Sequence, residues 1–165
     1  MKRTGGASAR PPERGALIHY HEIALKGKNR SFFLRQLEAN ILLATRDLDC
    51  GPLKRLAGRL FLTMHAETSW EVLRQRMSRV FGIANFSPAV MMAPNLELLA
   101  QRIEEEVSSR SFRSFRVAAR RAFKTFPQTS QEINEIIGAR VQRICGTRVD
   151  LTNPELTIYI EILPA

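Results

Sequence analysis

Segments with the alternation or the continuous apolar character of β-strands occur at four places in the first half of the chain: residues 16–24, 52–58, 59–64 and 85–92. Gly58 marks the turn of a hairpin between the second and third segments. Apolar residues recur at helical spacing over residues 30–46 and again from Trp70 to Val80, which predicts two helices. The resulting order, strand–helix–strand–strand–helix–strand, is a split βαβ arrangement.

Two capping signals accompany these predicted helices. Asn29 is placed to act as the N-cap of the first helix, whose apolar positions are Phe33, Leu37, Ile41 and Ala44. Thr68-Ser69-Trp70-Glu71 has the form of a capping box and predicts the start of the second helix.

A second set of elements follows the break at residues 93–95, which contains a proline and predicts a domain boundary. Asn95 is expected to cap a helix that turns Glu97 and residues 104–106 outward. The apolar stripe of this helix is Leu96, Leu99, Ala100, Ile103 and Val107. Near the end of the chain, Asn153-Pro154 predicts a turn, and residues 156–163 predict a final strand. Asp150 is interpreted as a structural hydrogen-bonding residue.

The segment 111–127 predicts a strand with one basic face. No acidic residue lies between Val107 and Gln131. The positions on one face are Phe115, Val117 and Ala119, and those on the other are Arg116, Ala118 and Arg120.

This strand leads into a predicted helix start. Phe126-Pro127 ends the strand, and Thr129-Ser130-Gln131-Glu132 is a capping box. The expected apolar stripe of the helix is Ile133, Ile136, Ile137, Val141 and Ile144. A basic strand that leads into a helix N-terminus favours phosphate binding, because free N–H groups add to the side-chain charge. The alternative is a solvated basic strand without a ligand.

The composition supports an anionic partner. The chain has 165 residues, 44% of them apolar, a net charge of +9 and a sequence pI near 10.5. Nucleic acid and a membrane surface are the usual partners of so basic a chain. No apolar run approaches the ~20 residues of a membrane span, so we expect no membrane partner.

Residues 1–14 are expected to form a disordered basic arm. Cys50 and Cys145 form no CxxC pair, which indicates a reducing, cytoplasmic setting.

Two motifs resemble those of RNA-modifying proteins. The ordered combination Phe-Arg-Val…Arg-Arg…Lys-x-Phe-Pro…Ser-x-Glu-Ile…Gly, followed by Val-Asp-Leu-Thr-Asn-Pro-Glu at residues 149–155, resembles the THUMP domain. His-Glu-Ile-Ala-Leu-Lys-Gly-Lys-Asn-Arg at residues 21–30 resembles the opening signature of the tRNA 4-thiouridine synthetases, a tRNA sulfurtransferase family also tied to thiamine biosynthesis. That family usually has Arg-Tyr-Gly or Arg-Tyr-Ser where this chain has His19-Tyr20-His21.

The resemblance implies an α+β fold with a ferredoxin-like domain over residues 15–92 and a THUMP domain over residues 93–165 that lacks its last strand. It implies a tRNA partner, gripped at the acceptor stem and 3′ end. The phosphate contacts that the motif match implies are Arg116, Arg120, Arg121 and Lys124. A second basic patch precedes the first helix and consists of Lys26, Lys28 and Arg30, for which the alternative is a solubilising turn.

The chain contains no Gly-rich phosphate loop, nucleophile elbow or paired-carboxylate motif. By resemblance, catalysis belongs to a downstream ATP-pyrophosphatase domain, so we expect neither enzyme activity nor a cofactor in this chain and ATP only downstream. We therefore predict a cytoplasmic tRNA-binding module from the N-terminal part of such an enzyme.

Three alternatives remain open at this stage. The first is a stand-alone THUMP RNA-binding protein, and the second is the N-terminal part of another THUMP enzyme, such as a tRNA methyltransferase. The third is a metalloprotein that uses His19 and His21 as ligands. Whether the module forms a homodimer is also left open.

Overall fold

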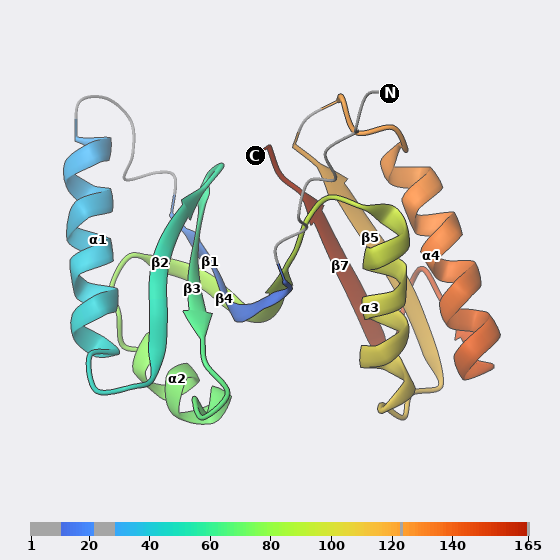
Figure 1. Cartoon of the computed structure of the whole chain (residues 1–165), viewed down its shortest axis with the longest axis horizontal. Helices are drawn as coiled ribbons and strands as arrows, with labels where there is room; N and C mark the ends of the chain where they lie inside the picture. The colour runs from blue at the N-terminus through green and yellow to red at the C-terminus, as the bar shows by residue number, and fades with distance from the viewer. Residues whose placement is uncertain (1–10, 22–28, 123, 165) are drawn as a thin grey trace, which may run out of the picture. The chain divides into compact units, whose positions relative to one another are not determined.

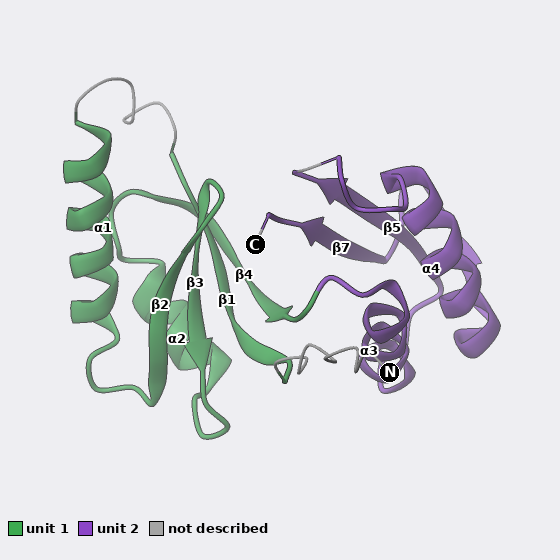
Figure 2. Cartoon of the chain, turned by 45° about the horizontal axis from the view of Figure 1, so that its top comes forward, with its two compact units in different colours: residues 1–93 green, residues 94–165 purple. Residues whose placement is uncertain are grey.

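The computed structural model describes residues 11–21, 29–122 and 124–164 and divides the chain into two compact units, residues 1–93 and 94–165 (Figures 1 and 2). Each unit consists of a sheet whose one face is covered by two helices, as the composition of the two hydrophobic cores shows.

The first unit has the predicted element order. Its elements are β1 (Glu13–Tyr20), α1 (Arg30–Ala44), β2 (Cys50–Leu56), β3 (Arg59–Met64), α2 (Trp70–Met77) and β4 (Ile83–Met91). The four-stranded sheet has the order β2-β3-β1-β4, and all its pairs are antiparallel. The core joins β1 and β3 to both helices through Ile18, Leu62, Leu37 and Leu73.

The β2–β3 hairpin turns at Gly58 with φ = 72°, a conformation that glycine adopts without strain. In a strand with regular alternation Phe61 lies on the face opposite Leu60 and Leu62, yet all three residues are buried and Phe61 is only 1% exposed. The ring lies against Gly15 of β1, where an added Cβ would be 2.6 Å from it. The missing side chain therefore leaves room for this ring.

Both capping predictions in this unit need correction. Asn29 is the N-cap residue of α1, but its side chain makes no capping bond. The capping box expected before α2 is absent, because Ser69 is the N-cap and the Thr68 hydroxyl donates instead to the Asp49 carbonyl. The first strand begins at Glu13 rather than at residue 16, and α1 ends at Ala44 rather than at residue 46.

The second unit contains α3 (Leu96–Ser108), β5 (Ser114–Arg121), α4 (Ser130–Cys145), β6 (Arg148–Val149) and β7 (Leu156–Ile162). Its sheet has the order β6-β5-β7, and both pairs are parallel. The Asn95 side chain caps α3 by accepting a hydrogen bond from the Leu98 amide, as predicted.

Helix α4 buries a narrower stripe than the sequence predicts. Ile133, Ile137 and Val141 are buried, whereas Ile136 and Ile144 are 39% and 43% exposed. The prediction that Glu104 faces outward is also wrong, because this side chain is only 18% exposed and pairs with Arg140 of α4. The position of Glu104 follows from the packing of α3 against α4, which brings Arg140 to this carboxylate.

Two further findings bear on function. No helix among the described residues is long and apolar enough to cross a membrane. Cys50 and Cys145 are both free thiols.

Candidate nucleic-acid interface

The two faces of β5 differ as the sequence predicts. Phe115 and Val117 are buried in the core beneath α3 and α4. On the other side, the β5–β7 register pairs Arg116 with Thr157, Ala118 with Tyr159, and Arg120 with Glu161. Registered neighbours project to the same side of a sheet, so these residues share the face away from the helices. We call it the open face: Arg116, Ala118, Arg120, Thr157, Tyr159 and Glu161.

Arg116 is anchored on the open face. Its Nε donates to the Thr157 hydroxyl at 3.3 Å, and its Nη1 donates to the Leu151 carbonyl at 3.4 Å. A guanidinium has five N–H donors, so others remain for a ligand. The two bonds therefore position this cation without neutralising it.

Arg120 and Arg121 point to opposite sides of the sheet at the end of β5. Arg120 is exposed on the open face, and no described carboxylate lies within ion-pair distance of it, although Glu161 is its register neighbour. Arg121 lies on the helix side, where its Nη1 donates to the Phe126 carbonyl at 3.0 Å. This bond ties the loop before α4 to the end of the strand.

The start of α4 adds backbone donors beside Arg121. The predicted capping box is present, with the Thr129 hydroxyl accepting from the Glu132 amide and Glu132 accepting from the Thr129 amide. The first-turn amides of Ser130 and Gln131 have no intrahelical acceptor, as at every helix start. Hydrogen bonds from the backbone and side chain of Thr129 lower the pKa of Glu132, and the charge of Arg121 adds to this effect.

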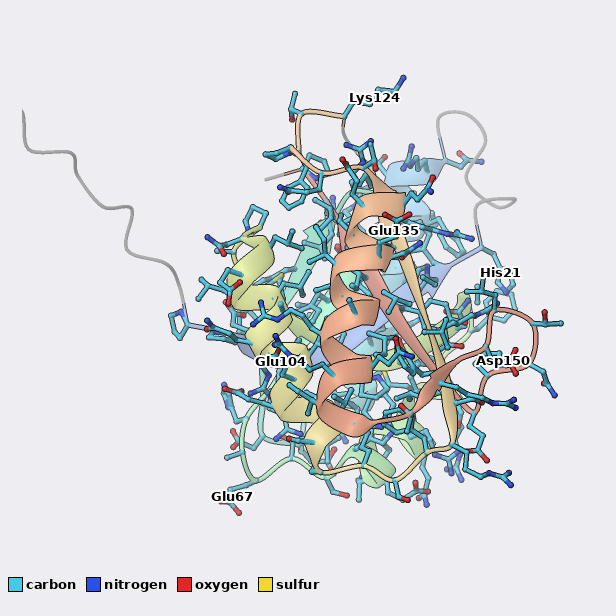
Figure 3. The ribbon with its side chains drawn as sticks, turned by 90° about the vertical axis from the view of Figure 1, so that its right-hand side faces the viewer. His21, Glu67, Glu104, Lys124, Glu135 and Asp150 are labelled. Carbon is cyan, nitrogen blue, oxygen red and sulfur yellow. The ribbon has the colours of Figure 1, made fainter. Side chains whose placement is uncertain are left out.

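Lys124 is exposed on the loop that precedes α4, at the end of the unit where this helix begins (Figure 3). We call Arg120, Arg121, Lys124 and the first turn of α4 the β5–α4 basic end. The parallel sheet brings these groups to the same end of the unit, because the helix after β5 starts close to the carboxyl end of that strand. Arg120 lies on the open face there, and Arg121 and the first turn of α4 lie on the helix side. Within the described residues, none of the three cations has a carboxylate partner in ion-pair distance.

The Asn134 side chain fixes the start of α4 to the strand. Its Oδ1 accepts a hydrogen bond from the Ala119 amide at 2.8 Å. Strand β6 pairs only with Ser114 and Phe115, so it does not reach this part of β5. The Asn134 side chain thus satisfies the Ala119 amide on the side of β5 where β6 does not reach.

The second predicted patch is only partly described. Arg30 is exposed and is the first residue of α1, whose first turn contains no acidic residue. Lys26 and Lys28 lie outside the described residues.

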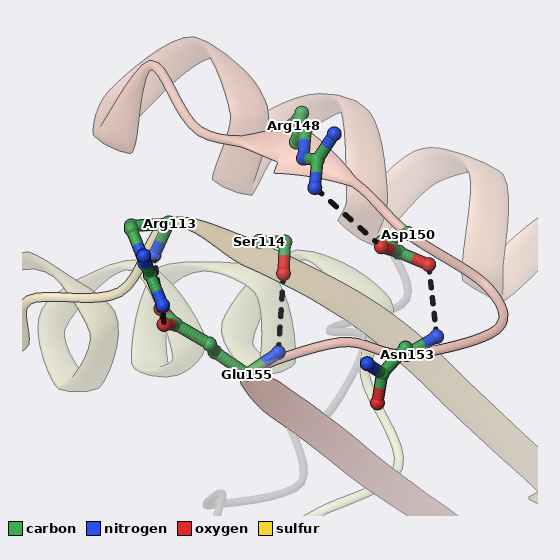
Figure 4. Close-up of a pocket in the computed structure, with 6 residues that line it drawn as sticks. All are labelled: Arg113, Ser114, Arg148, Asp150, Asn153 and Glu155. Atoms are coloured by element: carbon green, nitrogen blue, oxygen red, sulfur yellow. Dashed lines mark hydrogen bonds and ion pairs between the residues drawn. The ribbon is translucent and has the colours of Figure 1, made fainter.

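A different polar pocket lies at the opposite, amino end of β5 (Figure 4). It has a volume of about 440 Å³ and is lined by Arg113, Ser114, Arg148, Asp150, Asn153 and Glu155. Here the cations are paired, because Arg113 bonds Glu155 at 2.5 Å and Arg148 lies 3.8 Å from Asp150. The hydrogen bond from Arg113 lowers the pKa of Glu155.

Asp150 has the structural role that the sequence predicts. Its Oδ1 accepts hydrogen bonds from the amides of Thr152 and Asn153, and these bonds lower its pKa. The sequence interpretation did not identify the pocket itself, because its lining combines residues 113–114 with residues 148–155, which are distant in the chain.

The sequence interpretation also did not single out Tyr159, which is 74% exposed in the middle of β7. The alternation of Tyr159 with the apolar residues Ile158 and Ile160 is the signal that would have found it. For His19 and His21, the described part of the chain contains no group of three or more residues able to hold a metal ion.

Both units match known domain families. The family model of the ThiI ferredoxin-like domain matches residues 16–87, and that of the THUMP domain matches residues 93–164. These matches confirm the predicted α+β fold, a ferredoxin-like domain followed by a THUMP domain.

The relatives are longer proteins. The chain is 40% identical over 154 residues to the probable tRNA sulfurtransferase of Coxiella burnetii and 36% identical over 156 residues to that of Natranaerobius thermophilus. Each match covers 88% of this chain but only 38% of the relative. A solved complex of a 4-thiouridine synthetase with RNA and bound ATP is similar with a TM-score of 0.77 and 28% identity, covering 90% of this chain and 38% of that one.

Proposed function

Since the chain belongs to the family of the tRNA sulfurtransferases, with a ThiI ferredoxin-like domain followed by a THUMP domain, we propose that it binds tRNA through the β5–α4 basic end. The ligand is the phosphate backbone of the acceptor stem and 3′ end. A-form RNA has a deep, narrow major groove that side chains do not read, so phosphates and 2′-hydroxyls are the accessible features.

The observation that carries this proposal is the distribution of paired and unpaired cations in the second unit. Arg102, Arg113, Arg140, Arg143 and Arg148 each have a carboxylate partner. Arg110, Arg116, Arg120, Arg121 and Lys124 have none among the described residues. Arg121 and Lys124 lie close to the start of α4, and Arg120 lies at the same end of β5 on the open face. Unpaired cations beside free backbone N–H groups are what a phosphate requires.

We propose further that the complete protein makes 4-thiouridine in tRNA and that this chain delivers the tRNA to a catalytic domain. The support is the family and the short span of the chain, which covers 38% of the curated relatives that it matches. In this proposal the sulfur-transfer chemistry and its ATP belong to the remaining part, and this chain has no cofactor of its own. A tRNA ligand also favours a cytoplasmic location.

The test is binding of an acceptor-stem minihelix, measured by fluorescence anisotropy. The double variant Arg120→Ala/Lys124→Ala is expected to bind about tenfold or more weakly, because it loses two charge-assisted phosphate contacts. A matched control removes the same charge at the other end of β5 through Arg113→Ala/Arg148→Ala, which we expect to bind nearly as tightly as the unmodified chain. Equal losses in both double variants would show that net charge, not this site, governs binding.

A further inference from the structure

Tyr159 is an unusual residue for its position. It lies in the middle of β7, yet 74% of its surface is exposed, whereas its neighbour Ile160 is buried beneath the helices. Both helices of this unit pack on the other face of the sheet, so neither covers the ring. A large aromatic ring exposed in the middle of a strand lacks the packing that usually accompanies that residue type.

The neighbours of Tyr159 leave its ring accessible. Its register partner on β5 is Ala118, whose single methyl group is too small to cover the ring. Arg116 and Arg120 occupy the positions two residues to either side of Ala118 on the same face. They are therefore separated by about 13 Å along the strand, with the ring beside the midpoint.

We propose that Tyr159 is a stacking platform for one unpaired base of the bound RNA, with Arg116 and Arg120 contacting the phosphates on either side. This inference rests on the proposed function and extends it from phosphate contact to recognition of a single-stranded segment. Arg120 belongs to both surfaces, so the RNA backbone at the β5–α4 basic end continues directly onto the open face.

The chemistry of the site favours a base over an apolar protein partner. Aromatic side chains on sheets bind unpaired bases by stacking, and the bases accept this contact whatever their identity. A protein partner would need a wider apolar patch, but the ring is bordered by Arg116, Arg120, Thr157 and Glu161. The anchored guanidinium of Arg116 adds a fixed cation on the same face.

The experiment compares two RNAs with the 165-residue chain: a minihelix with a single-stranded 3′ overhang and the same duplex with a blunt end. Tyr159→Ala is expected to bind the overhang RNA about tenfold to a hundredfold more weakly and the blunt RNA with unchanged affinity. Tyr159→Phe keeps the ring and should retain binding. A 2-aminopurine in the overhang should lose fluorescence on binding to the unmodified chain, and this quenching should be absent with Tyr159→Ala.

Two outcomes would overturn the inference in different ways. If the unmodified chain prefers the overhang but Tyr159→Ala binds both RNAs as tightly as the unmodified chain does, the stacking role is wrong and the proposed function stands. If the unmodified chain binds neither RNA, both are wrong. Since Tyr159 is exposed, thermal melting should show the same stability for all three proteins, which separates lost stacking from lost folding.

Discussion

At the scale of single residues, the carboxylates within reach decide which arginines are available to a ligand. Arg113 and Arg120 belong to the same basic segment, yet Arg113 bonds Glu155 and Arg120 has no described carboxylate in ion-pair distance. The partner of Arg113 is 42 residues away in the chain, so no local pattern could reveal it. The sequence thus predicted the basic character of the strand but not which of its cations are paired.

Thr129 provides a direct test of the cap that starts α4. Its hydroxyl accepts the Glu132 amide, and Thr129→Ala is expected to lower the free energy of unfolding by about 1 kcal/mol. Urea denaturation measures this change. Ser69→Ala is the matched control, because Ser69 is an N-cap whose side chain makes no capping bond, and it should change stability by only a few tenths of a kcal/mol. Equal losses would show that the hydroxyl bond of Thr129 is not what stabilises the helix start.

Glu132 should make the stability of the second unit depend on pH. Its pKa is lowered from the ordinary value of 4.5 in the folded chain, chiefly by hydrogen bonds from Thr129. A carboxyl with a lowered folded pKa stabilises the fold fully above its unfolded pKa, and this contribution is lost as the pH falls through the folded pKa. Thermal melting between pH 7 and pH 3 should therefore show a fall in melting temperature below about pH 4.5 that is smaller in Glu132→Gln. The same fall in both proteins would contradict this role.

At the scale of elements, periodicity predicted the order and type of the helices and strands but not the width of their buried faces. Ile136 and Ile144 fit the apolar stripe of α4, yet both are exposed, and the core contains only Ile133, Ile137 and Val141 of that stripe. Glu104 fits an outward position on α3, yet it lies against Arg140 of the neighbouring helix. Both misses concern contacts between elements that are distant in sequence. The two-residue strand β6 is too short to produce any period.

The pair of helices in the second unit is joined by Arg140, which bonds Glu104 at 2.5 Å and Glu97 at 2.6 Å. Arg140→Ala would leave the largely buried Glu104 without this partner and is expected to cost about 1–3 kcal/mol of unfolding free energy. Arg102→Ala is the comparison. Among the described residues Arg102 pairs with Glu105 and Glu106, both of its own helix, which predicts a loss of about 0.5 kcal/mol. Chemical denaturation of both variants decides the matter, and a larger loss for Arg102→Ala would contradict the bridging role.

At the scale of the whole molecule, composition alone gives the net charge of +9. The fold places part of this charge at the β5–α4 basic end. The internal ion pairs leave the cations of the β5–α4 basic end without carboxylate partners among the described residues. The family likeness, and not composition, is the ground on which we propose RNA as the partner.

Binding should respond to salt in proportion to the phosphates that are neutralised. For about five contacts, the logarithm of the affinity should fall against the logarithm of salt concentration with a slope of roughly −4. Arg120→Ala and Lys124→Ala should each reduce the magnitude of that slope by about one unit. Anisotropy titrations from 50 to 200 mM salt measure it. A slope near zero would mean that phosphates contribute little to binding.

The hydrogen bond between Asn134 and the Ala119 amide has a consequence for how the chain behaves among copies of itself. Beyond the short β6, the outer side of β5 offers main-chain groups of the kind that recruit foreign strands into aggregates. The Asn134 side chain, which projects from α4, accepts the hydrogen bond of one of these donors, so that donor is not available to a strand of another molecule. Asn134, which fixes the start of α4 to β5, therefore also helps to prevent edge-to-edge association of two molecules along this side of β5.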